Sequence, residues 1–99
     1  MDKYFETCIG ANLYKLSNKN ILRVYDMCDD PEYPYGYDYF DGKTKELIDG
    51  GVFAVHGEAE EIVKEAIRWC DLNPDEVTYK LIAEDVEYDD LEEMGYSGF

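Results

Sequence analysis

The sequence predicts an α+β fold in which a small antiparallel β-sheet packs against one main amphipathic helix. Residues 57–72 carry apolar side chains at helical spacing, and the segments around them are rich in β-branched and aromatic residues. Turn signals separate these segments, whereas no repeat or linker divides the 99 residues. We therefore expect one domain over residues 1–99.

The helix over residues 57–72 is the clearest of the expected elements. Its apolar residues recur at positions that fall on one side of a 3.6-residue helix, and charged residues occupy the other side. Asn73-Pro74 ends the helix, because proline disfavours α geometry in the residue before it. The stripe needs an apolar surface, which the strands must supply. Its members are Ala59, Ile62, Val63, Ala66, Ile67 and Cys70.

Four tyrosines at every second position, from Tyr33 to Tyr39, dominate the segment before the helix. An extended chain places all four on one face, and Pro34 and Gly36 confine the first half to an edge position or to irregular backbone. The face suits either sheet packing or a protein-contact surface. No lysine or arginine lies between residues 23 and 43, so we do not expect these rings to stack on nucleic-acid bases.

Shorter segments complete the expected sheet. Residues 1–16 fit either a helix or a strand over 13–16, and residues 21–27 are strand-like. Asp41-Gly42 predicts a hairpin turn. The further expected elements are a return strand at 44–48, a turn at Gly50-Gly51, a strand at 52–55, a strand rather than a capped helix at 77–83, and a short C-terminal helix through Tyr88, Leu91 and Met94.

Charge is the most unusual property of the chain. There are 24 acidic residues against 9 basic ones, for a net charge of −15, which repels nucleic acid and anionic membranes and favours a basic partner. Aromatic residues make up 15 % of the chain, which argues against disorder. No long apolar run predicts a membrane span. Three widely spaced cysteines, Cys8, Cys28 and Cys70, favour reduced thiols and a cytoplasmic location.

The sequence lacks a complete catalytic or metal-binding motif. Gly42-Lys43-Thr44 resembles the end of a phosphate-binding loop, but Tyr37 stands where that motif needs glycine. Asp85, Glu87 and Asp89 are spaced like calcium ligands, but the glycine of that loop is missing. The single histidine, His56, has no cysteine near it in sequence. We therefore expect no enzyme activity, no cofactor and no metal site.

Acidic clusters are the one functional signal. They run from Asp26 to Asp41 and from Glu84 to Glu93, and a third follows Glu58, Glu61 and Glu65 on the helix. Carboxylates at helical or strand spacing can approximate a row of phosphates, although they also serve solubility. The expected partner-binding residues are Asp29, Asp30, Glu32, Asp38, Asp41, Tyr35, Tyr37, Asp85, Glu87, Asp89 and Asp90.

In its size, its charge and its acidic stretches 26–41 and 84–93, the chain resembles small inhibitor proteins of phages and mobile elements. Anti-CRISPR and anti-restriction DNA mimics belong to this group. The resemblance implies a protein that blocks the basic cleft of a nucleic-acid-processing protein. It includes no family-specific motif, so it assigns no role to single residues. The alternative is an accessory domain that forms a homodimer or a protein contact through its tyrosine-rich face.

Overall fold

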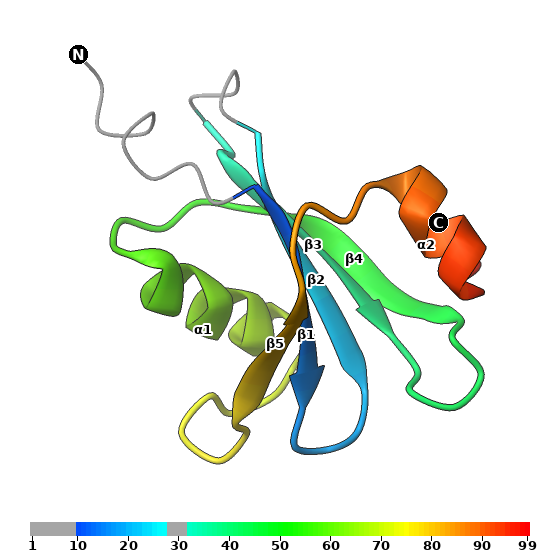
Figure 1. The fold of residues 1–99 in the computed structure, drawn as a ribbon. Helices are drawn as coiled ribbons and strands as arrows, with labels where there is room; N and C mark the ends of the chain where they lie inside the picture. The colour runs from blue at the N-terminus through cyan, green and yellow to red at the C-terminus, as the bar shows by residue number, and fades with distance from the viewer. Residues whose placement is uncertain (1–9, 28–31) are drawn as a thin grey trace.

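The computed structural model describes residues 10–27 and 32–99 as one five-stranded antiparallel sheet with a helix on each face (Figure 1). The strand order is β4-β3-β2-β1-β5, so β4 and β5 are the edges. The predicted α+β class is confirmed. The elements are β1 (Ala11–Leu16), β2 (Ile21–Asp26), β3 (Tyr35–Phe40), β4 (Leu47–Phe53), α1 (Ala59–Trp69), β5 (Tyr79–Ala83) and α2 (Tyr88–Met94).

Helix α1 covers one face of the sheet and encloses the larger core. Its buried residues are Ile62, Val63, Ala66 and Ile67, which are central members of the predicted apolar stripe. Because side chains alternate along a strand, every second residue of β1, β2 and β3 faces this helix. The strand residues in this core are Tyr14, Leu16, Leu22, Val24, Tyr35, Tyr37, Tyr39 and Phe53.

From Tyr35 on, the tyrosine segment is an interior strand, so the edge position was wrong, whereas Tyr33 and Pro34 have the irregular backbone that was the alternative. Strand β3 lies between β2 and β4, and three of the four tyrosines are buried beneath α1. Gly36 is accommodated because the ring of Tyr25, its cross-strand neighbour, fills the space that a side chain would need. Tyr33 precedes the strand and is exposed. The alternating tyrosines therefore mainly reflect packing of the sheet against α1.

Gly50-Gly51 lies inside β4, and the turn predicted there was wrong. Residues 44–48 and 52–55 were expected as two strands, but a single strand from Leu47 to Phe53 pairs continuously with β3 around one register shift. The reversal occurs earlier, at residues 41–46. There the side chain of Asp41 accepts hydrogen bonds from the backbone N–H groups of Lys43 and Thr44.

Helix α2 and the segments around it form a second, smaller core on the other face of the sheet. The helix begins with a reciprocal capping pair between Glu87 and Asp90 and ends at Gly95, whose φ of 96° suits glycine. The predicted C-terminal helix is confirmed, as are strands within 13–16 and 77–83. This core consists of Leu13, Ile21, Phe40, Val86, Leu91 and Tyr96.

Replacing Ile67 with alanine should test the α1 core. Ile67 is fully buried, so Ile67→Ala should lower the free energy of unfolding by about 2–5 kcal/mol. The matched change Ile48→Ala alters a side chain that is 54 % exposed and should cost less than about 0.5 kcal/mol. Urea unfolding followed by circular dichroism measures both. Equal losses would contradict this assignment of the core.

Candidate functional site

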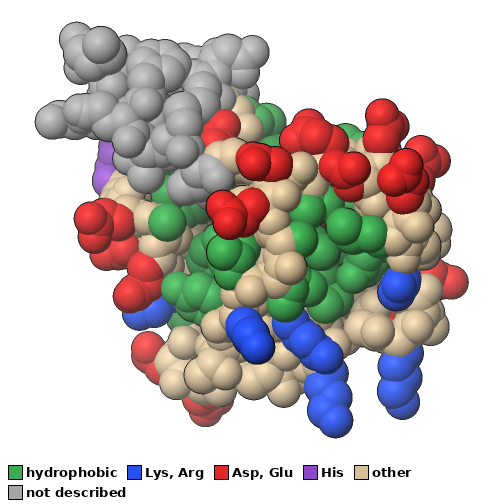
Figure 2. Space-filling model, viewed as in Figure 1, with side chains coloured by type: hydrophobic (Ala, Val, Ile, Leu, Met, Phe, Trp, Pro, Cys, Tyr) green, Lys and Arg blue, Asp and Glu red, His purple; other side chains and the backbone are tan. Residues whose placement is uncertain are grey.

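The acidic and basic side chains of the molecule are unevenly distributed. Figure 2 shows acidic side chains gathered along the margin where α2 lies and lysine and arginine side chains mainly at the opposite margin, with further acidic side chains at the left and lower left. At that opposite end, Lys15, Lys19 and Lys43 line one depression, and Lys80 pairs in register with Lys15. We call the exposed acids of α2 and the loop before it the acidic ridge: Glu84, Asp85, Glu87, Asp89, Glu92 and Glu93.

One residue of the first acidic stretch meets the second. Asp26, at the end of β2, lines a cavity of about 270 Å³ together with Asp85 and Glu87. The two acidic stretches, far apart in the sequence, therefore share one end of the sheet at this point. The third cluster, on α1, lies across the sheet from the ridge (Figure 1).

The remaining acids of the predicted set are in other places. Glu32 is exposed before β3, and Asp90 is half-buried because it caps the first turn of α2. Asp41 lies at the lysine-rich end, where backbone hydrogen bonds from Thr44 and Lys43 lower the pKa of its carboxyl group. Asp29 and Asp30 lie outside the described residues.

Three predicted contact residues are buried, and the structure corrects their role. Tyr35 and Tyr37 are each 3 % exposed beneath α1, so they cannot form a contact surface in this fold. The hydroxyl of Tyr37 lies 3.0 Å from a carboxylate oxygen of Asp49 on β4 and 3.3 Å from the backbone carbonyl oxygen of Trp69 on α1, so it contacts both sheet and helix. Asp38 is also buried, on the other face of β3.

Asp38 forms an ion pair with Arg23 that links the sheet to the segment carrying the ridge. Arg23 Nη1 lies 2.9 Å from Asp38 Oδ2, and Arg23 Nε donates to the backbone carbonyl of Val86 at 2.7 Å. The guanidinium carbon lies 4.7 Å from the ring centroid of Tyr25 and 4.5 Å from that of Tyr88. This arginine therefore contacts two polar groups, from the buried residues Asp38 and Val86, and two aromatic rings. Sequence reasoning missed the pair, although each residue is a charge with apolar or aromatic neighbours on both sides in its strand.

Burial dominates the electrostatics of this cluster. It raises the pKa of Asp38, while Arg23 and a hydrogen bond from Tyr88 act in the opposite direction. Burial also raises the pKa of Tyr25 well above its ordinary value, with the neighbouring Tyr88 adding to the shift. Tyr25 therefore remains a neutral hydrogen-bonding group at physiological pH.

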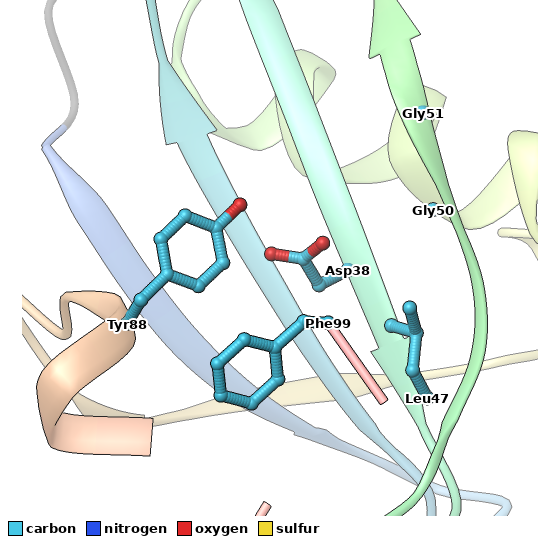
Figure 3. Close-up of a pocket in the computed structure, with 6 residues that line it drawn as sticks. All are labelled: Asp38, Leu47, Gly50, Gly51, Tyr88 and Phe99. Atoms are coloured by element: carbon cyan, nitrogen blue, oxygen red, sulfur yellow. The ribbon is translucent and has the colours of Figure 1, made fainter. Parts of the chain in front are cut away.

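A pocket of about 520 Å³ opens beside this cluster, between α2 and β4 (Figure 3). The carboxylate of Asp38 lies at its centre, with the rings of Tyr88 and Phe99 on one side and Leu47 on the other (Figure 3). Gly50 and Gly51 border it without side chains. The pocket thus combines aromatic walls with one buried carboxylate.

Among the described residues, the other chemically reactive side chains, His56 and Cys70, are not grouped, and Cys8 and Cys28 lie outside the described residues. Burial raises the pKa of the Cys70 thiol to about 12, which makes it a poor nucleophile. His56 precedes α1 and Cys70 follows it, so roughly 16 Å of helix separates them. In the described part of the chain, no group of three or more His, Cys, Asp or Glu side chains could hold a metal ion. None of the described helices is long and apolar enough to cross a membrane.

Comparisons of the chain with protein-family models, with curated proteins and with solved structures found no match.

Breaking the Arg23–Asp38 pair from one side should destabilise the fold strongly. Arg23→Met leaves a buried carboxylate without its cation, which should cost about 3–5 kcal/mol in the free energy of unfolding. The double variant Arg23→Met/Asp38→Leu should recover much of this loss, because no uncompensated charge remains buried. Urea unfolding measures both, and a double variant as unstable as the single one would contradict the assigned role.

The pH dependence of Arg23→Met provides a separate check. The pKa of Asp38 in the folded protein is already raised, and removing Arg23 should raise it further. An acid whose folded pKa lies above its unfolded pKa binds more protons when folded, so its stabilising contribution is lost as the pH rises. The stability difference between wild type and Arg23→Met should therefore shrink on acidification. A difference that grows would contradict the assignment.

Proposed function

We propose that this protein is a non-enzymatic inhibitor of the DNA-mimic type, which inserts its acidic ridge into the basic cleft of a nucleic-acid-processing protein. The main support is the uneven distribution of charge, with six exposed acids in the ridge and, at the opposite end, four lysines accompanied by Asp41. Such an arrangement orients the molecule as it approaches a positively charged surface, so that the acids arrive first.

The geometry of the ridge supports mimicry of a charged polymer. Asp89 and Glu93 are four residues apart on α2, and residues with this spacing are neighbours on a helix surface, with Cβ atoms roughly 5–6 Å apart. Asp85 and Glu87 extend the row of acids before the helix. A row of carboxylates can thus interact with the lysines and arginines that bind phosphates in the partner.

The ridge is also held in place before binding. The capping pair of Glu87 and Asp90 begins α2, Leu91 is fully buried, and Arg23 binds the backbone of the preceding loop. Ordered charges lose less conformational entropy on binding than flexible ones. This property distinguishes the proposed inhibitor from a merely soluble acidic surface.

An accessory domain that forms a homodimer is the second candidate, supported by the two edge strands. Ile48 and Val52 on β4, and Leu81 and Ile82 on β5, are exposed, and exposed edge strands favour pairing with another chain. The tyrosine-rich face itself is not available for such a contact, because α1 covers it.

A pair of matched double variants tests the proposed inhibitor. Asp89→Lys/Glu93→Lys changes the ridge, whereas Asp75→Lys/Glu76→Lys changes exposed acids in the α1–β5 connection. Each double reversal raises the net charge by four units, from −15 to −11. Immobilised protein incubated with bacterial lysate should capture a basic protein that duplex DNA displaces. The ridge variant should bind that protein at least about tenfold more weakly, and the control should bind it normally.

The salt dependence separates the possible outcomes. Binding should weaken steeply as the salt concentration rises toward about 0.5 M, where exposed charges are largely screened. Equal losses in both variants would show that net charge alone matters. A ridge variant that binds normally, or a captured protein that duplex DNA does not displace, would overturn the proposal.

A further inference from the structure

The pocket between α2 and β4 holds a carboxylate with one oxygen directed away from its internal partner. Asp38 Oδ2 binds Arg23, whereas Asp38 Oδ1 lies 3.4 Å from the position that a Cβ atom on Gly50 would occupy. The second oxygen is therefore on the β4 side, where the pocket opens (Figure 3). The side chain of Asp38 is only 9 % exposed, so this oxygen is weakly hydrated.

The internal arginine does not fully compensate this carboxylate. Burial raises the pKa of Asp38 even though Arg23 lies within hydrogen-bonding distance. A second cation on the pocket side would stabilise the ionised form further. The net charge of −15 and the nearby ridge raise the local concentration of cations around this opening.

Aromatic rings line the same pocket at positions suited to a planar cation. The rings of Tyr88 and Phe99 are stacked, with centroids 5.3 Å apart and an interplanar angle of 25°. The ring of Tyr88 already packs against Phe99 and Arg23, whereas Phe99 is 43 % exposed and supplies the accessible ring surface of this wall. Arg23 shows the same combination inside the protein, because its guanidinium group lies against Tyr88 and binds Asp38.

We propose that this pocket binds the guanidinium group of an arginine side chain, which stacks on the Tyr88–Phe99 wall and donates to Asp38 Oδ1. A guanidinium group fits better than an ammonium group, because it is planar, stacks on rings and is more weakly hydrated. The origin of this arginine in a basic partner rests on the proposed function. The pocket would then supply a specific anchor beside the less specific charges of the ridge.

Nuclear magnetic resonance with a defined probe tests the pocket directly. The probe is Nα-acetyl-arginine N-methylamide, titrated into the full-length ¹⁵N-labelled protein at constant ionic strength. Saturable shifts should be confined to the amides of Leu47, Gly50, Gly51, Tyr88 and Phe99. The citrulline analogue has nearly the same shape without the charge and should cause no saturable shift. Equal shifts with citrulline, or shifts spread over the ridge without saturation, would overturn the proposal.

Two positions on β4 offer a test of the location. A side chain at Gly50 would meet Asp38 Oδ1, whereas Ile48 is exposed and does not line the pocket. Gly50→Val should weaken binding of the probe at least about tenfold, and Ile48→Ala should leave it unchanged. Equal effects of the two changes would contradict the assigned location.

A further variant covers the case in which Gly50→Val does not fold. Phe99→Ala removes one exposed ring of the wall and should weaken binding of the probe by a similar factor. Normal binding of the probe by this variant would overturn the proposal. The two proposals fail separately. If the probe does not bind, only the proposal for the pocket is refuted. If Asp89→Lys/Glu93→Lys captures the partner normally, only the proposal for the ridge is refuted.

Discussion

The buried ion pair between Arg23 and Asp38 is the interaction on which the arrangement of the second face depends. Arg23 extends from β2, binds a carboxylate on β3, the carbonyl of Val86 and two tyrosine rings. A buried charge is costly unless it is fully paired, so these partners must remain together in the folded state. The position of α2 follows from this requirement as much as from the contacts of Leu91.

Much of the fold could be predicted from local patterns, because those patterns report burial. The stripe of α1, the strand at 21–27 and the short C-terminal helix each follow from side-chain periodicity. The edge or irregular backbone expected for the first half of the tyrosine segment fits Tyr33 and Pro34 but not Gly36, which lies in an interior strand. No local pattern shows that the ring of Tyr25 fills the space beside this glycine. Gly50-Gly51 was misplaced for a related reason, since its continuous pairing with β3 is a long-range property.

The candidate site could be predicted only in part. The acids of residues 84–93 were recognised from composition, and most of them are exposed. Asp38 was assigned to a surface on the same basis, although pairing between β2 and β3 places it opposite Arg23. Composition identifies charged stretches, but only the sheet register decides which carboxylates face water. The pocket between α2 and β4 could not be predicted, because residues from β3, β4, α2 and the C-terminal end form it.

The two cores of the molecule differ in size, and this difference has a consequence for how the protein opens. The α1 core unites four strands with an eleven-residue helix, whereas the other face relies on six buried residues and a seven-residue helix. A helix of seven residues does not persist alone in water, so separation of α2 from the sheet is also its melting. Local unfolding of α2 would therefore disorder the row of carboxylates in the acidic ridge, while the sheet beneath α1 stays intact.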